Sequence, residues 1–288
     1  MKNSYWIIGL VLLAFIGDRL GGMILQKLIE RSQFRYSRIE KGATKNVDIL
    51  LIGNSRGLTF YQPAIEKLTG KSTLNISYNG LPMNLARAIV QDQLQKNGTP
   101  KVALIDITLC TKSNQELISS FKAYATCSQP IADLLRQQDV KTYRASRVSH
   151  LYRYNSEVFQ RALFYLNQSD EDWLLDRTIT QAMVENAALL EPYQLKVKPQ
   201  QLVALQKTIW ELEEAGTEVH LVVGPYFPTF RLAGLEEYIQ QVESACQKEV
   251  HDFSNLLSEP AHFGDYQHPN VAGSLLYMEA LDQEGLFD

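Results

Sequence analysis

Cysteine is scarce in this sequence of 288 residues, because only Cys110, Cys127 and Cys246 occur. Their number is odd and no two of them form a Cys-x-x-Cys pair, which argues against a disulfide framework and against a cysteine-rich zinc site. A single Cys110–Cys127 disulfide stays open at this point. Apart from one histidine discussed below, the histidines show no metal-ligand spacing, so we expect no metal and no cofactor.

An excess of basic charge is also missing. Lys and Arg number 28 against 32 Asp and Glu, which gives a net charge of −4 and argues against a nucleic-acid binder. The loop after the first predicted strand lacks Gly-x-Gly-x-x-Gly and Gly-x-x-x-x-Gly-Lys-Ser/Thr, so nothing there would cradle nucleotide phosphates. With 45% apolar and 21% charged residues, the composition is that of a folded globular protein of one or two domains.

No uncharged run in the chain reaches the roughly 20 residues that cross a bilayer. The run from Tyr5 to Ile16 has twelve residues, and extending it to Leu25 takes in Asp18 and Arg19. We predict an uncleaved membrane anchor over residues 1–28, followed by a polar and basic linker over 29–46. Two alternatives stay open: a cleaved signal peptide, although no clear small-x-small cleavage site follows the run, and a buried helix of a soluble protein.

The charges beside this run bear on membrane orientation. Only Lys2 precedes it, whereas six basic residues follow it within a short distance: Arg19, Lys27, Arg31, Arg35, Arg38 and Lys41. Taken literally, the positive-inside rule would place the bulk of the chain in the cytoplasm.

Short apolar runs that end at turn residues predict β-strands. They cover residues 47–53, 72–80, 101–107 and 218–224, with a less regular fifth over 250–257. Helical patterns occupy 84–95, the stretch that ends at Gly216, and about 269–286. Strands that alternate with helices predict an α/β fold, in which a parallel sheet is flanked by helices in three layers, as in flavodoxin-like proteins. We expect this domain over residues 47–288, interrupted by a helical insertion at about 113–200.

Ser55 follows the first predicted strand in the sequence Gly53-Asn54-Ser55-Arg56. Ligands of an open parallel sheet bind at the carboxyl ends of its strands, and Gly53 allows the backbone to turn sharply there. Such a turn exposes the hydroxyl beside backbone N–H groups, which suits a nucleophile that also needs an oxyanion donor. The alternative is a serine that only caps the following helix.

Asp265 and His268 lie together near the C-terminus, in Asp265-Tyr266-Gln267-His268-Pro269-Asn270. A serine hydroxyl needs a base to take its proton, and histidine is the side chain that titrates near neutral pH. The base needs a carboxylate that fixes its tautomer, and Asp-x-x-His supplies both groups from one loop. The alternative is a surface turn with a helix cap.

These two separated motifs resemble the first and last sequence blocks of the SGNH/GDSL hydrolase superfamily. The first block there is Gly-Asp-Ser-x, and the Gly-Asn-Ser-Arg variant found here resembles membrane-anchored, extracytoplasmic members. Asn79-Gly80 corresponds to the second block, a glycine after strand two. The third block, Gly-x-Asn-Asp, has no counterpart after the third strand, which ends Asp106-Ile107-Thr108.

The resemblance implies a role for each residue that matches a block. Ser55 would be the nucleophile, His268 the base and Asp265 the residue that orients it. The backbone N–H groups of Ser55 and Gly80 would stabilise the oxyanion. With the third block missing, Asn114 is a candidate for the third donor, and Asn79 or Asn54 are candidates to replace it.

The function that the resemblance implies is a serine esterase or acyltransferase that acts on acyl groups, acetyl above all, ester-linked to cell-envelope carbohydrate. It implies a single-pass protein of a bacterial-type cytoplasmic membrane, with its catalytic domain extracytoplasmic and a multi-pass membrane acyltransferase as a partner. We follow it over the charge count, because large domains translocate despite flanking charge. The alternative is a non-catalytic module of the same fold that binds glycan or scaffolds an envelope complex.

A basic stretch within the predicted insertion has two interpretations. Five basic residues, Lys141, Arg144, Arg147, Arg153 and Arg161, lie among Tyr143, Tyr152 and Tyr154. They would suit an anionic glycan or a lipid headgroup. The alternative, which the sequence favours, is a solvated helix face.

Overall fold

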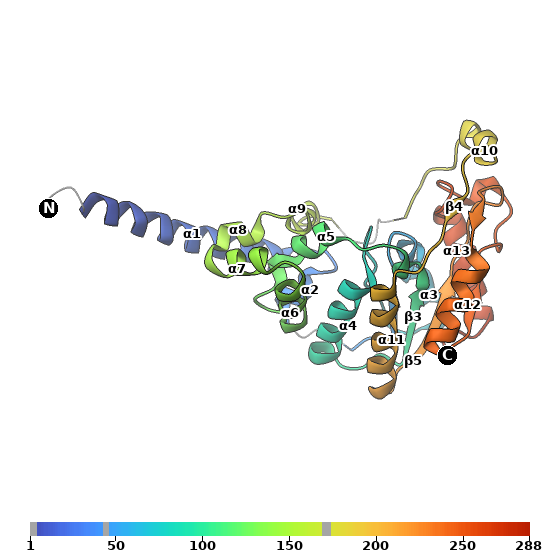
Figure 1. The fold of residues 1–288 in the computed structure, drawn as a ribbon, viewed down its shortest axis with the longest axis horizontal. Coiled ribbons are helices and arrows are strands. Elements are labelled where there is room, and N and C mark those ends of the chain that lie inside the picture. Colours follow the sequence, from blue (N-terminus) through green and yellow to red (C-terminus); the bar gives the residue numbers. More distant parts are fainter. Residues whose placement is uncertain (1–4, 43–45, 169–173) are drawn as a thin grey trace. The chain divides into compact units, whose positions relative to one another are not determined.

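A computed structural model describes residues 5–42, 46–168 and 174–288 of the chain (Figure 1). The chain divides into two compact units. Residues 1–44 and 115–170 belong to the first, called the helical unit below, and residues 45–114 and 171–288 belong to the second, called the sheet unit.

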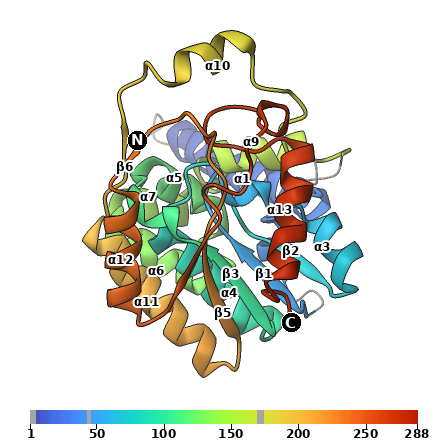
Figure 2. The same ribbon diagram turned by 90° about the vertical axis from the view of Figure 1, so that its right-hand side faces the viewer.

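The sheet unit contains five parallel strands. In spatial order they are β2 (Thr73–Asn75), β1 (Ile49–Ile52), β3 (Val102–Asp106), β5 (Glu218–Val223) and β7 (Val250–Asp252). Figure 2 shows β1, β3 and β5 next to one another. All residues of β1 and β3 are buried, as expected for strands covered on both faces.

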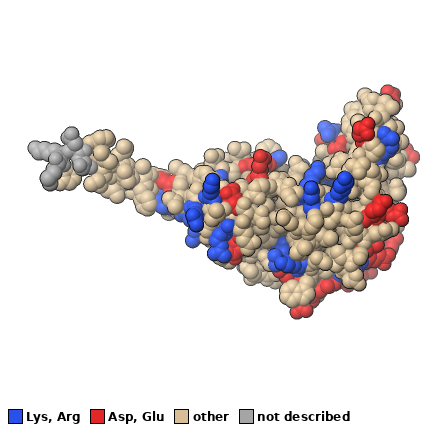
Figure 3. Space-filling model, in the orientation of Figure 1, with Lys and Arg blue, Asp and Glu red and all other residues tan. Residues whose placement is uncertain are grey.

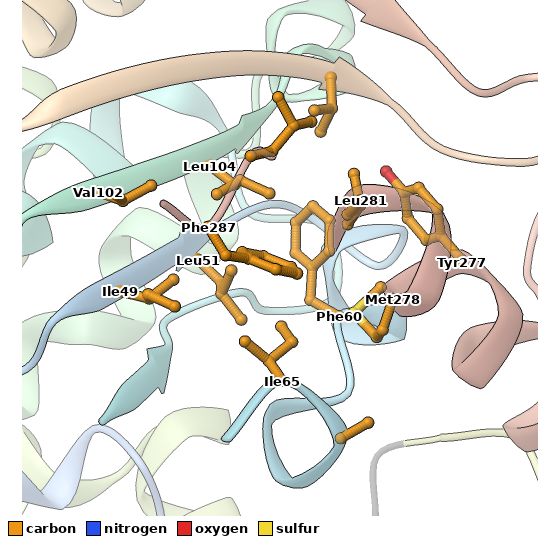
Figure 4. Packing of buried hydrophobic residues seen from close by; sticks show 13 residues of the cluster. Ile49, Leu51, Phe60, Ile65, Val102, Leu104, Tyr277, Met278, Leu281 and Phe287 are labelled. Carbon is orange, nitrogen blue, oxygen red and sulfur yellow. The ribbon is translucent and has the colours of Figure 1, made fainter. Parts of the chain in front are cut away.

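One face of the sheet packs against α3 (Gln62–Thr69) and α13 (Val271–Gln283). Side chains from the strands meet side chains from these helices in a single apolar cluster (Figure 4). The strands contribute Ile49, Leu51, Val102 and Leu104, and the facing segments contribute Phe60, Ile65, Tyr277, Met278 and Leu281. This packing holds the segments before and after the two motifs against the sheet.

The other face is covered by α4 (Met83–Asn97) and α11 (Pro199–Glu214), which pack against each other (Figure 1). The remaining elements of this unit are α12 (Leu235–Cys246), which packs on α11, the helix α10 (Gln181–Ala187), and a small parallel pair, β4 (Tyr193–Gln194) with β6 (Leu232–Ala233). The unit is therefore three-layered, with a parallel sheet between helices, as the sequence predicts.

The observed strands are shorter than the predicted ones. Residues 72–80 were expected to be extended, but β2 ends at Asn75. The Asn75 side-chain amide donates hydrogen bonds of 2.9 Å to the carbonyl oxygens of Gly57 and Phe60, so it anchors the first loop rather than continuing the strand. The weak fifth prediction, over 250–257, corresponds to β7, which has three residues. The pair β4 and β6 has no counterpart in the prediction, because each strand has only two residues.

The helical unit combines the N-terminal helix with the first half of the predicted insertion. Its elements are α1 (Tyr5–Arg31), α2 (Ser37–Lys41), α5 (Gln115–Ser120), α6 (Gln129–Gln138), α7 (Val140–Val148), α8 (His150–Tyr154) and α9 (Glu157–Phe164). Phe34 and Tyr36, which lie in the predicted linker, are buried and pack with Phe121 and Tyr165. The predicted insertion at 113–200 also includes α10 and β4 of the sheet unit.

Helix α1 is the one helix of the described residues that is long and apolar enough to cross a membrane, by length and composition alone. Its only buried residues are Gly22 and Ile29, which argues against the interpretation as a buried helix of a soluble protein. The three cysteines are free, so the described structure contains no Cys110–Cys127 disulfide.

Candidate active site

Ser55 lies in the tight turn that follows β1. The chain passes through Gly53 and Asn54 and then enters a short 3₁₀ helix, Gly57–Thr59, instead of the α-helix that the sequence suggests. A side chain on Gly53 would bring its Cβ within 2.4 Å of the Gly57 Cα, so only glycine allows the turn to close this tightly. The turn leaves the Ser55 hydroxyl partly exposed at the carboxyl end of the strand.

His268 and Asp265 lie in the loop before α13 and reach Ser55 across 213 positions of sequence. The His268 Nε2 atom lies 3.0 Å from the Ser55 Oγ. The His268 Nδ1 atom lies 2.8 and 3.0 Å from the two carboxylate oxygens of Asp265. Because the carboxylate accepts the Nδ1 proton, Nε2 is left with a lone pair directed at the serine hydroxyl, which is the arrangement of a nucleophile, a base and an orienting carboxylate.

The sequence left open that the Asp-x-x-His motif only forms a turn with a helix cap, but a different residue caps the helix that follows it. Asn270 accepts a hydrogen bond of 3.1 Å from the backbone N–H of Gly273 and so caps α13. It also donates one of 2.7 Å to the carbonyl oxygen of Ala261. The Asp265 carboxylate is therefore available to the imidazole of His268, and it accepts the backbone N–H groups of Gln267 and His268 as well, at 2.9 and 3.0 Å.

The four predicted oxyanion and substrate residues differ in where they lie. Asn54, Asn79 and Gly80 line, together with Ser55, a pocket of about 130 Å³. Asn114 does not line this pocket, because its amide donates a 3.0 Å hydrogen bond to the carbonyl oxygen of Gly80. Gly80 has φ of +70°, a conformation that glycine adopts readily, and the hydrogen bond from Asn114 helps to hold this turn in position.

The Asn54 side chain connects the first loop with the loop after β3. Its Oδ1 accepts the backbone N–H of Arg56 at 2.9 Å, and its Nδ2 donates to the Thr108 hydroxyl at 3.0 Å. The Thr108 backbone N–H donates to the buried Asp106 carboxylate at 2.8 Å, as does its hydroxyl. Asp106 thus caps the turn after its strand and also supports the residue that Asn54 contacts.

Arg56 is the residue of this site to which the sequence analysis assigned no role. Its side chain is 5% exposed and donates to the carbonyl oxygens of Gly224 at 2.6 Å, Pro225 at 3.0 Å and Gln267. Its guanidinium lies 3.5 Å from the centre of the Tyr226 ring, and its Nε is 3.8 Å from the Asp106 carboxylate. Arg56 therefore joins the ends of three strands to the loop that carries His268. The one feature of the sequence that could have indicated this role is a charged residue directly after a turn that was expected at the end of a buried strand.

Further pocket residues come from the loops that follow β3 and β5 and from the short strand β4. Tyr226, which follows β5, is buried beneath Arg56, and burial raises the pKa of its hydroxyl to about 12. Lys112 and Tyr193 also line the pocket, with the Lys112 ammonium 5.7 Å from the centre of the Tyr193 ring. Tyr193 belongs to the short strand β4, which the sequence did not reveal. Across the described residues, no group of three or more His, Cys, Asp or Glu side chains could hold a metal ion.

The environment of Asp265 favours its charged form. Burial pushes the pKa of the carboxyl upward, but the hydrogen bond and charge of His268, with the two backbone N–H groups, outweigh burial and leave the pKa below its ordinary value of 3.8. A carboxyl with a lowered folded-state pKa stabilises the protein above its unfolded pKa, and this contribution is lost as pH falls through the folded pKa.

We therefore expect the stability advantage of the native protein over Asp265→Asn to be largest at neutral pH and to shrink below about pH 4, where the unfolded carboxyl takes up its proton. Urea unfolding of both proteins in detergent micelles at a series of pH values measures this difference. Asp176→Asn, which changes an exposed aspartate of the same unit, serves as the control. A difference that stays constant down to pH 3 would contradict the assignment of an ionised, hydrogen-bonded Asp265.

A scan against protein-family models and a search of curated proteins found no match to this chain. The case for its chemistry therefore depends on the geometry of the site.

Proposed function

We propose that this protein is a serine esterase or acyltransferase of the SGNH/GDSL type, acting on acyl groups that are ester-linked to cell-envelope carbohydrate. The observation that carries the proposal is the relay from Ser55 Oγ through His268 Nε2, at 3.0 Å, to Asp265, at 2.8 Å from Nδ1. Distances of 2.6–3.2 Å are those at which a base can take a proton from a nucleophile.

In the proposed reaction, Ser55 Oγ attacks the carbonyl carbon of the ester while its proton moves to His268 Nε2. The imidazolium that forms is stabilised by the Asp265 carboxylate, which keeps its own charge. The tetrahedral oxyanion then collapses, the carbohydrate oxygen leaves with the proton from His268, and the acyl group remains on Ser55. Water or a second hydroxyl group, deprotonated by His268, attacks the acyl-enzyme and releases Ser55, so the acceptor decides between hydrolysis and transfer.

The size of the pocket favours a short acyl chain. Its volume of about 130 Å³ lies well below the roughly 300–1,000 Å³ of pockets that enclose drug-sized ligands. An acetyl group suits a space of this kind, and the carbohydrate would remain largely outside it. The polar lining, with Asn54, Asn79 and Lys112, suits an oxygen-rich leaving group.

The oxyanion would be stabilised from the two loops that meet at Ser55. We assign the backbone N–H groups of Ser55 and Gly80 to this role, because both residues line the same pocket. Asn79 is the candidate for a third donor, since it lines the pocket at the turn before Gly80. Asn114 would act on Gly80 through its hydrogen bond to the Gly80 carbonyl oxygen.

The test is covalent labelling of Ser55. A fluorophosphonate probe is expected to label the full chain in detergent, and Ser55→Ala is expected to abolish both labelling and the turnover of acetyl esters. Ser258→Ala, which changes an exposed serine of the same unit, should leave both intact. A native protein that neither reacts with the probe nor turns over any ester, while Ser55→Ala keeps its function in cells, would favour a non-catalytic glycan-binding or scaffold module instead.

We place the catalytic domain on the extracytoplasmic side of a bacterial-type cytoplasmic membrane, with α1 as a single-pass anchor. The support is the exposed apolar surface of α1, together with the resemblance to anchored enzymes that modify envelope polymers. A multi-pass membrane acyltransferase would then supply the acyl group. Protease added to intact spheroplasts is expected to digest the sheet unit, and protection of that unit would reverse the orientation.

A further inference from the structure

The apolar surface of α1 extends further along the helix than its uncharged run. Its exposed apolar residues continue past Asp18 and Arg19 through Leu20 and Met23 to Ile24. From Tyr5 to Ile24 the helix has 20 residues and a length of about 30 Å, the thickness of a hydrocarbon core. A membrane that covers this whole surface would therefore also cover the level of Asp18 and Arg19.

Both charged side chains at that level form hydrogen bonds with the corner between α7 and α8. The Asp18 carboxylate accepts hydrogen bonds from the Ser149 hydroxyl at 2.5 Å and from the backbone N–H groups of His150 and Leu151 at 2.9 and 3.1 Å. Arg19 donates to the Val148 carbonyl oxygen at 2.9 Å. The charges that made α1 an unusual anchor thus cap the start of α8 and the end of α7, and neither depends on water alone for its partners.

Two glycines bring this corner against α1. A Cβ on Gly22 would lie 2.2 Å from the His150 Cβ, and a Cβ on Gly21 would lie 2.8 Å from the Leu151 side chain. The corner is therefore in direct contact with α1 at residues 18–22, inside the 20-residue apolar span and close to its C-terminal end. If α1 crosses the membrane with this span, the corner reaches the membrane interface with it.

The exposed face of the corner has the composition that a membrane interface favours. On α7, residues Val140, Lys141, Arg144, Arg147 and Val148 are exposed and cover one face of about 120°. Val148 is 71% exposed and Leu151, across the corner, is 45% exposed. Residues 140–156 contain no Asp or Glu. Lys and Arg side chains gather beside the base of α1 in Figure 3.

We propose that the α7–α8 corner, residues 140–154, is a second membrane contact that lies in the interface of the leaflet where α1 leaves the bilayer. Val148 and Leu151 insert among the lipids, and Lys141, Arg144 and Arg147 bind the phosphates of anionic headgroups. The solvated helix face that the sequence favoured is on this view a lipid-binding face. The contact fixes the helical unit against the bilayer, so that α1 is more than a flexible tether. The inference rests on α1 lying in the membrane and is independent of the chemistry at Ser55.

The test measures the depth of single cysteines in the full chain, reconstituted in vesicles that contain phosphatidylglycerol. Val148→Cys, Val11→Cys and Phe164→Cys are labelled with an environment-sensitive fluorophore, and nitroxide-bearing lipids serve as quenchers. The parent chain, labelled in parallel, supplies the background from the native cysteines. Phe164 is the matched control, because it is 61% exposed in the same unit. Phe164 lies beside Tyr165, whose carbonyl oxygen accepts a hydrogen bond from the backbone N–H of Gln33. Gln33 follows the end of α1, about 20 Å beyond Asp18 in the direction of that helix.

We expect nitroxides deep in the acyl chains to quench the label at Val11. Headgroup nitroxides should quench the label at Val148 several-fold more than the label at Phe164, which should remain in water. A quenched label at Val11 with Val148 no more quenched than Phe164 would overturn the second contact while leaving the anchor intact. An unquenched label at Val11 would overturn both.

A charge-reversal variant tests the headgroup contact separately. In Lys141→Glu/Arg144→Glu/Arg147→Glu, quenching of the Val148 label is expected to fall several-fold in vesicles with phosphatidylglycerol and to change little in phosphatidylcholine alone. All three side chains are exposed, so folding should not depend on them. Equal quenching of the native and reversed chains in phosphatidylglycerol would refute the role of the basic residues.

Discussion

Ser55→Ala is expected to lower kcat for ester cleavage by roughly a millionfold, and His268→Ala by a similar factor, since such groups act as a unit. The serine is the only bonding partner of the acyl group in the proposed reaction, and His268 Nε2, at 3.0 Å, is the group that activates it. Because the two residues serve the same step, the double variant should be no slower than either single one. Steady-state rates with acetyl esters measure all three.

The controls change similar residues of the same unit outside the relay. Ser258 is exposed and His262 lies six positions before His268, so Ser258→Ala and His262→Ala should keep kcat within a small factor of the native value. Asp265→Asn is expected to lie between the two groups, with a loss of about ten-thousandfold, because the imidazole would be held in the wrong tautomer. If the rate losses of the Ser55 and His268 single variants multiplied in the double variant, that result would contradict a shared proton relay.

Arg56→Met is expected to lower the free energy of unfolding by about 3–5 kcal/mol, which is the usual cost of removing one partner from a buried ion pair. The Asp106 carboxylate, 1% exposed, would lose the only guanidinium beside it in the described structure. Three carbonyl oxygens, those of Gly224, Pro225 and Gln267, would lose their donor as well. Urea unfolding in detergent micelles measures the change.

The same variant is expected to slow the chemistry when measured where it is still folded. Gln267 directly precedes His268, so releasing its carbonyl lets the imidazole move relative to Ser55, and a misplacement of about 1 Å costs roughly a hundredfold in rate. Arg56→Lys should be intermediate, since an ammonium keeps the charge without the planar fork that reaches several carbonyls at once.

Arg87→Met is the matched control for Arg56. Arg87 pairs with Glu211 on the helices of the opposite face, where both side chains are partly exposed. Its loss should cost less than about 1 kcal/mol and leave kcat unchanged. Equal unfolding midpoints for Arg56→Met and the native chain would show that Arg56 does not hold the loop in place.

Strand positions and motif order could be predicted because they depend on local patterns. The apolar run at 47–53 and its glycine suffice to predict a buried strand followed by a tight turn, since only neighbouring residues are involved. Parallel strands bring their carboxyl ends to one edge, so residues that follow strands were expected near one another. Ser55, Asn79 and Gly80 indeed line one pocket.

The partners of individual side chains could not be predicted in this way. Arg56 donates to residues 168, 169 and 211 positions away, and nothing in its neighbourhood indicates those partners. Asn114 was a candidate third donor from its residue type, but its amide is directed at the Gly80 carbonyl. Nothing beside Asp18 in the sequence indicates which groups it contacts, because the N–H groups whose hydrogen bonds it accepts lie some 130 positions further along the chain.

The sequence by itself determined an α/β sheet unit, an apolar N-terminal helix, and two polar motifs at loops that face the same sheet edge. These features follow from periodicity and turn chemistry, which act over a few residues. Only the tertiary structure decided that His268 and Asp265 reach Ser55, that Arg56 joins three strand ends to their loop, and that Asp18 caps α8. Those contacts depend on where strands and helices pack in space, because hydrogen bonds act over about 3 Å and carry no trace in the spacing of distant residues.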